Sequence, residues 1–486
     1  MSDLTTIQAS PSERTAIAAK PYRIDRLPAL VFTGCLAVYL LWWAAFYPGL
    51  MSWDSITYVW QVTTGNWRAD HSVLYDALVW LSLAATGDLA ALTLVQAAAA
   101  ALTLAVLACV VRDFGVPWAW CLAAALAVAA LPATGTFVVT VWKDVPFALA
   151  LVLMTATLGR LALRRRSWPL IVALGVEVLV LCLLRNNGFL FAAIAIALAV
   201  ILLPGTRVRL AGAAAVPLAT VYLVTAYAYP AMSVDPVRPW LSYATAYSDI
   251  AVTYARRPAA FQDRDLALMA QIAPLEHWKS NANCLNADTT LSAGFDVARA
   301  DRLYKKLVGL WVRLIKRAPD AVTAARLCRG SVAWVAFPAQ PGERVLVGMP
   351  NVPEDLYGWR ASGQTMAASP YRPILATRPL SQTLHDAAVF VRGLSLTEQF
   401  EWLLWRGATW CYLVYAAAAA LAWAGRRQAA LVLAVVVAGH QLAVTAAIPA
   451  QLFRYMAAPI MIGIMLLPIL VAVLSKRLRR PAGEGQ

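Results

Sequence analysis

The chain alternates long apolar runs with short polar breaks, and this pattern predicts its elements. A helix rises about 1.5 Å per residue, so about 20 apolar residues cross about 30 Å of hydrocarbon. The runs predict ten transmembrane helices, at about 28–47, 89–111, 117–139, 145–163, 168–184, 188–203, 210–229, 404–424, 429–448 and 456–474. We therefore predict an all-α, multi-pass membrane protein.

Basic residues beside the runs predict its orientation. Arg and Lys accumulate in cytoplasmic loops, and residues 1–27 resemble a retained cytoplasmic tail rather than a cleaved signal peptide. With that tail inside, all the adjoining basic clusters fall on the cytoplasmic side, at Arg112, 164–166, Arg207, Arg209, 426–427 and the tail 476–486. We expect a protein of the cytoplasmic membrane whose odd-numbered loops face outward.

Two outward-facing regions interrupt the spans. The first outer loop, 48–88, contains a short apolar segment at 72–87. If this segment crossed the membrane, every later loop would change sides, so we expect an interfacial or re-entrant helix. The second region, 230–403, separates a transmembrane module at 28–229 from C-terminal helices at 404–475. It is hydrophilic, and helical periodicity at about 296–329 predicts that it is mostly helical.

Composition narrows the class of protein. Hydrophobic residues make up 61% of the 486 residues and charged residues 14%, against about 25% charged in soluble domains. This excludes a soluble enzyme, a disordered chain and a small disulfide scaffold. The net charge is +15, which we attribute to cytoplasmic loops rather than to nucleic-acid binding. The lipid bilayer is thus the first expected partner.

Cysteine and histidine indicate little metal chemistry. Of the seven Cys, only Cys284 and Cys328 lie in the polar outer region, where an oxidising compartment would allow a disulfide between them. The sequence leaves that pairing open. With no CxxC or HExxH motif and four His in all, there is no strong metal motif. A cofactor, including a divalent cation, stays unknown.

Polar residues gather at the predicted outer ends of the runs. They are Asp54, His71, Lys143, Asp144, Arg185, Asn186, Asn187, Arg454 and Tyr455. Each has a structural alternative: Lys143 and Asp144 could cap the next helix as a salt bridge, and Arg454 could reach the interface. The predicted topology nevertheless puts all of them on one side. A carboxylate among several cations suits a lipid-linked phosphate substrate and an acceptor hydroxyl.

These residues lie in segments that resemble the glycosyltransferase-C superfamily, polytopic enzymes that use polyprenyl-phosphate sugar donors. Within it, the chain is similar to a bacterial family of uncharacterised, predicted glycosyltransferases. The matching segments are 47–49 with Asp54 and His71, then 142–147, 184–188 and 454–455. The first outer loop differs in having Ser72 after His71, where Pro is usual, and no Asp-x-Asp or Asp-Glu pair, so the resemblance implies no tightly held metal.

The resemblance implies an inverting hexosyl- or pentosyltransferase with its active site on the extracytoplasmic side. Asp54 would be the catalytic base, and Arg185, Arg454 and Lys143 would bind the donor phosphate. Supporting or acceptor-binding roles would fall to His71 and to Asp144, Asn186, Asn187 and Tyr455. The acceptor, whether glycan, lipid or protein, stays unknown.

Other classes of protein remain open. A transporter or flippase for a lipid-linked or anionic molecule would also hold cations in a cavity, nearer the membrane midplane. A non-catalytic assembly subunit is a third possibility, and a polysaccharide polymerase or ligase is a variant of the enzyme.

Overall fold

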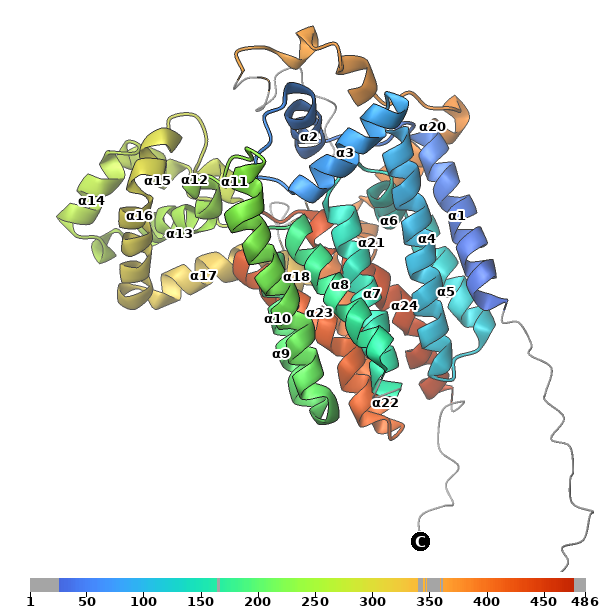
Figure 1. Ribbon diagram of the computed structural model, residues 1–486. Coiled ribbons are helices and arrows are strands. Elements are labelled where there is room, and N and C mark those ends of the chain that lie inside the picture. The colour runs from blue at the N-terminus through green and yellow to red at the C-terminus, as the bar shows by residue number, and fades with distance from the viewer. Residues whose placement is uncertain are drawn as a thin grey trace, which may run out of the picture.

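The computed structural model describes residues 26–163, 167–339, 344, 345, 347, 359 and 362–475. All regular elements within these residues are helices, and eleven of them form one bundle, in which they pack side by side (Figure 1). The bundle consists of α1 (Leu27–Ala45), α4 (Ala90–Asp113), α5 (Trp118–Ala130), α6 (Pro132–Val138), α7 (Asp144–Leu163), α8 (Trp168–Leu184), α9 (Gly188–Leu202), α10 (Arg207–Leu223), α22 (Gly407–Trp423), α23 (Arg427–Ala447) and α24 (Ala457–Leu474).

The prediction of ten spans is met only in part. Each of the ten predicted segments is helical, but six helices among the described residues are long and apolar enough to cross a membrane, or seven if α5 and α6 count as one. Three predicted spans, α8, α9 and α22, are apolar but only 17, 15 and 17 residues long. Multi-pass character is therefore supported and the number of spans is not.

The third predicted span is broken. The sequence pattern predicts a continuous helix at 117–139, whereas α5 and α6 meet at an angle of 68°. Pro132 begins α6, and Leu131 before it is extended, with φ −62° and ψ 128°. The proline ring disfavours a helical conformation in the preceding residue, and this explains the bend. The break turns α6 towards the site described below.

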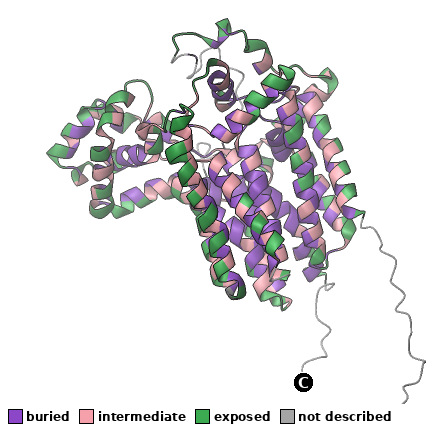
Figure 2. Ribbon diagram, viewed as in Figure 1, coloured by how far each residue is buried: buried purple, intermediate pink, exposed green. Residues whose placement is uncertain are grey.

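Exposed residues lie along the outside of the bundle (Figure 2), and many of them are large and apolar. Val172, Ile201 and Tyr222, for example, are 62–66% exposed on α8, α9 and α10. In water so large an apolar surface would be a liability, whereas lipid tails cover it favourably. Three of the predicted basic segments on the cytoplasmic side, at 1–25, 164–166 and 476–486, lie outside the described residues.

Three shorter helices lie across one end of the bundle (Figure 1). They are α2 (Trp53–Thr64), α3 (Val73–Thr86) and α20 (Gln382–Ser395). The helix α3 corresponds to the ambiguous segment at 72–87, and its 14 residues are too few for a span. Its oblique position over the bundle end agrees with the expected interfacial helix.

A side subdomain projects from the bundle near that end (Figure 1). It comprises α12 (Pro239–Ser242), α13 (Ala244–Arg256), α14 (Asp263–Ala270), α15 (Leu275–Ser280), α16 (Val297–Arg317) and α17 (Pro319–Arg329). It has its own hydrophobic core, which includes Trp278, Leu307 and Leu310. The helices α16 and α17 match the periodicity predicted for 296–329, with a break at Ala318 before Pro319. The remaining short helices are α11 (Tyr229–Ala231), α18 (Ser331–Trp334) and α21 (Glu398–Leu404).

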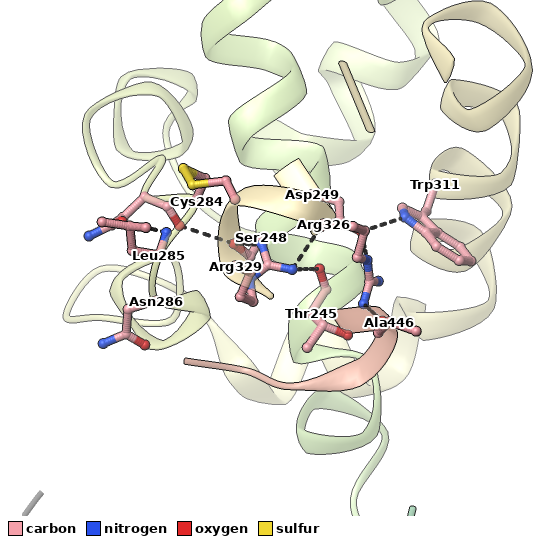
Figure 3. A network of polar contacts seen from close by, with 12 residues as sticks. Thr245, Ser248, Asp249, Cys284, Leu285, Asn286, Trp311, Arg326, Arg329 and Ala446 are labelled. Atoms are coloured by element: carbon pink, nitrogen blue, oxygen red, sulfur yellow. Dashed lines mark hydrogen bonds and ion pairs between the residues drawn. A yellow bond between two sulfur atoms is a disulfide. The ribbon is translucent and has the colours of Figure 1, made fainter. Parts of the chain in front are cut away.

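A buried charge network fixes this subdomain to the bundle (Figure 3). Asp249 of α13 accepts hydrogen bonds from Arg326 and Arg329 of α17, at 2.5 and 2.9 Å. Arg326 also donates to the backbone oxygen of Ala446, 2.9 Å away at the end of α23. Gly330 lies so close to α23 that an added Cβ would be 2.6 Å from the Cα of Thr445. The side subdomain is thus seated directly on α23.

A disulfide joins Cys284 to Cys328 in the same subdomain (Figure 3). The pairing that the sequence left open is therefore present in the structure. It links the loop after α15 to the end of α17, which packs against α23.

Candidate functional site

The site begins where the first loop pairs with the loop before α7. Leu50 and Thr140 form a parallel bridge. The N–H of Leu50 donates to the oxygen of Val139 at 3.0 Å, and the N–H of Val141 donates to the oxygen of Leu50 at 2.9 Å. Ser52 and Ser55 then cap α2 reciprocally, and Ser55 donates to the oxygen of Val141 at 2.7 Å. This arrangement puts the first turn of α2, with Asp54, beside the start of α7.

Four charged side chains form a continuous chain of ion pairs there. Asp54 pairs with Arg454, which comes from the turn Phe453–Met456 before α24. Arg454 also lies 3.6 Å from Asp144, and Asp144 pairs with Arg185 at the end of α8. The Asp144 side chain is only 2% exposed. Four segments far apart in sequence therefore meet at one end of the bundle.

Lys143 and His71 form a second contact in the same place. The Nζ atom of Lys143 lies 3.2 Å from Nδ1 of His71. An ammonium group can only donate, so His71 accepts at Nδ1 and carries its proton on Nε2. The ring of His71 also contacts Tyr58 edge-on, with centroids 5.2 Å apart.

The Arg185-Asn186-Asn187 turn ties α8 to the first loop. Arg185 donates through Nε to Asn187 at 3.3 Å, and Asn186 donates to the oxygen of Ala69 at 3.0 Å. Gly188 follows because an added Cβ there would lie 2.0 Å from the oxygen of Leu181. The two Asn residues thus position their neighbours: one orients Arg185 and the other holds the loop that leads to His71.

Aromatic rings separate and orient the two guanidinium groups. The ring of Tyr455 lies 4.6 Å from the guanidinium carbon of Arg185 and 5.4 Å from that of Arg454. Trp142 covers Arg454 from another side at 5.2 Å. Cations over aromatic faces are stabilised without being neutralised, so both guanidinium groups keep their charge.

The electrostatics of the site favour an ionised carboxylate and a neutral imidazole. Burial disfavours the charged form of Asp54, but the neighbouring basic groups, first of them Arg454, together outweigh it and hold the pKa of that carboxyl well below its usual value. Burial, and then the charge of Lys143, lower the pKa of His71 to about 3. Burial also lowers the pKa of Lys143, against the attraction of Asp54. At neutral pH, Asp54 is an anion and His71 is uncharged.

Asp54 and His71 also line a cavity of about 310 Å³. The cavity wall continues over α2 and onto the side subdomain. Arg185, Lys143, Asp144 and Arg454 are not among the lining residues. Asp54 therefore stands between a group of cations and an open, largely apolar cavity.

The structure thus brings together all nine polar residues that the sequence singled out at the outer ends of the runs. Sequence reasoning missed further neighbours. His440 of α23 donates to the oxygen of Tyr455 at 2.6 Å, and the buried hydroxyl of Tyr58 has no hydrogen-bond partner among the described residues. Asp288 of the side subdomain lines the cavity. All three lie inside apolar or loop segments that carry no motif.

The described residues contain no group of three or more His, Cys, Asp or Glu side chains arranged to hold a metal ion. Comparison of the chain with family models, with curated proteins and with solved structures found no match. The roles of the residues are therefore inferred from the geometry of the site.

Proposed function

We propose that this protein is a membrane glycosyltransferase that moves one sugar from a polyprenyl-phosphate donor to a hydroxyl acceptor at the outer face of the cytoplasmic membrane. The observation that carries the proposal is the position of Asp54. It lies between a cation cluster, which suits the phosphate of a donor, and a cavity, which suits an acceptor. The resemblance of the site segments to the glycosyltransferase-C superfamily supports the same reading.

The cluster carries more positive than negative charge, which favours an anionic ligand. Three cations (Lys143, Arg185 and Arg454) face two carboxylates, Asp54 and Asp144, so the cluster has a net charge of +1. Arginine binds phosphate in a planar, bidentate way, and lysine binds it as a point charge. A donor phosphate would therefore complete the neutralisation of this cluster.

In the proposed reaction the acceptor oxygen attacks the anomeric carbon of the donor sugar. The bond from that carbon to the phosphate oxygen breaks, and the electron pair leaves with the polyprenyl phosphate. Attack on the face opposite the phosphate inverts the anomeric centre, and Asp54 takes the proton of the acceptor hydroxyl, which balances the step. Arg185 and Arg454 would stabilise the charge that develops on the leaving phosphate.

Donor binding would also activate the base. Arg454 lowers the basicity of Asp54 by pairing with it. A phosphate that competes for the same guanidinium would weaken that pair and raise the pKa of the carboxyl. General bases work best when their pKa approaches the ambient pH. The base would thus gain strength only when the donor is present.

A transporter or flippase is the second candidate, and the bend between α5 and α6 favours it. Transporters often bind substrates at discontinuous helices, and α6 leads directly to the loop that carries Lys143. The two candidates differ in outcome: a transferase cleaves the donor and a transporter returns it intact.

The test uses the whole protein in nanodiscs with a small panel of polyprenyl-phosphate sugars and cell-envelope extract as acceptor. Release of polyprenyl phosphate by the wild type, and not by Asp54→Asn, is the expected result. Movement of intact donor across liposomes without cleavage would establish a transporter instead. If the protein neither cleaves nor binds any donor of the panel, both proposals are overturned.

A further inference from the structure

The cavity beside Asp54 is built jointly by the first loop and the side subdomain. Its walls include Trp53, Trp60, Arg68, Asp70, Trp240 and Asp288. The first four come from α2 and the loop after it, whereas Trp240 lies in α12 and Asp288 in the turn Ala287–Thr289. Ligand sites commonly combine an apolar, aromatic lining with a few placed polar groups. This cavity has that character.

The cavity lining has no surplus of cations, because its two arginines, Arg68 and Arg238, face three carboxylates, those of Asp54, Asp70 and Asp288. Arg68 lies 3.6 Å and Arg238 3.4 Å from the same carboxylate oxygen of Asp70. The backbone N–H of Arg238 also donates to Asp70, at 3.1 Å. A cavity selective for phosphate or carboxylate would carry a surplus of cations. Here the charge pattern favours an uncharged ligand.

Asp288 gives the cavity a carboxylate that is available to a ligand. The side chain is exposed to the cavity, and no described residue forms an ion pair or hydrogen bond with its carboxylate. Burial, and then the nearby charge of Asp54, raise the pKa of Asp288. An acidic group of this kind accepts hydrogen bonds from hydroxyls when ionised and donates one when protonated. In both states it suits a polyol.

The turn that carries Asp288 is held firmly beside Arg454. The N–H of Ala287 donates to the oxygen of Pro449 at 2.7 Å, and Asn286 pairs with Ala450 in an antiparallel bridge. The disulfide at Cys284 fixes the same loop to α17 (Figure 3). Asp288 therefore keeps a constant position relative to the proposed donor site, as a recognition residue must.

From this geometry we infer that the cavity is the acceptor subsite, that it takes an uncharged saccharide, and that Asp288 and Trp240 of the side subdomain recognise that saccharide. The inference rests on the proposed function. Tryptophan offers a flat apolar surface with one polar N–H, which matches a sugar ring with an apolar face and a hydroxyl rim. Asp288 binds the hydroxyls.

The donor sugar would have the same chemistry, but the position of Asp54 assigns the cavity to the acceptor. A general base must reach the acceptor hydroxyl. Asp54 touches the cations on one side and the cavity on the other. The donor sugar remains attached to a phosphate on the cation side, so the acceptor must approach from the cavity.

The binding test needs no turnover. Saturation-transfer NMR with the full protein in nanodiscs would measure binding of uncharged disaccharides, and of uronic acids and sugar phosphates of similar size. We expect the uncharged sugars to bind wild type and to bind Asp288→Asn and Trp240→Ala about tenfold more weakly. Asp263→Asn, at an exposed aspartate of the same subdomain, should bind like wild type.

Activity separates acceptor from donor effects. If the proposed function holds, Asp288→Asn should raise the KM for the acceptor about tenfold and leave donor affinity and acceptor-independent donor hydrolysis unchanged. Weaker donor binding in this variant would assign the cavity to the donor sugar and overturn the inference. So would equal binding in all variants, tighter binding of charged sugars, or no saccharide binding. Saccharide binding that depends on Asp288, without donor cleavage, would preserve the subsite and refute the transferase.

Discussion

Replacing Asp54 by Asn is the most informative single change at the site. The amide has nearly the same shape as the carboxylate, so it keeps the packing of α2 and removes the charge. The substitution removes the proposed base and also the ion-pair partner of Arg454. The net charge of the cation cluster rises from +1 to +2. Catalysis and donor binding are therefore expected to change in opposite directions.

The expected changes in kcat and in donor affinity follow from the contacts of Asp54. Loss of a general base lowers kcat by about 10²–10⁴-fold, or about 3–5 kcal/mol in the barrier. Under the proposed function, a donor phosphate would compete with Asp54 for Arg454 in the wild type, and a hydrogen bond to a charged group contributes about 1.5–3 kcal/mol. In the variant, Asp144 still competes for Arg454, which lies 3.6 Å from it. Donor binding therefore gains only part of the energy of the lost Asp54–Arg454 contact. We expect donor binding to tighten about tenfold.

Single-turnover release of polyprenyl phosphate and equilibrium donor binding would measure the two quantities separately. Asp113→Asn, at an exposed aspartate that ends α4, is the matched control and should change neither. Normal turnover by Asp54→Asn would refute the base assignment. A parallel fall in turnover, donor affinity and thermal stability would show that Asp54 serves only the structure.

Three further expectations test other contacts. Arg185→Lys keeps the charge beside Asp144 but loses the planar guanidinium, so donor affinity should fall about tenfold, and unchanged affinity would exclude a phosphate role. The pKa of His71 is depressed to about 3, so the unfolded state binds more protons below about pH 6.5. The melting temperature should therefore fall with pH from 6.5 towards 4, and less steeply in His71→Gln. Cys284→Ser removes a disulfide that spans 44 residues, so the free energy of unfolding of the side subdomain should fall by about 2–4 kcal/mol. The variant should melt at a lower temperature than the wild type, and reductant should not change its melting temperature.

The sequence predicted the elements of the bundle well because apolar runs of helical length depend on local composition. Each predicted run is helical, although the run at 117–139 forms two helices, and the short segment at 72–87 is the oblique helix α3. The number of spans was less predictable, because α8, α9 and α22 are shorter than the usual span. The break at Pro132 shows a second reason. Hydropathy averages over a proline, whereas the backbone bends there.

The candidate site was predictable to the extent that topology alone could place it. Positive-inside bias put Asp54, Lys143, Arg185 and Arg454 at one end, and the ion pairs bring them into contact. Asp288 could not be found in this way. It reaches the cavity through tertiary contacts of the side subdomain with the bundle, and no spacing in the chain encodes those contacts.

The arrangement of charges explains why one site can be both stable and reactive. A buried carboxylate beside a single arginine is stabilised by that arginine, but it is too weakly basic to take a proton. Here Arg454 is shared between Asp54 and Asp144, so it can move its interaction towards Asp144 and its own buried charge still has a partner. Under the proposed function, an arriving phosphate would drive that redistribution. Ser52, Ser55 and the α2 cap hold Asp54 in place meanwhile, so the carboxylate would gain basicity with little movement.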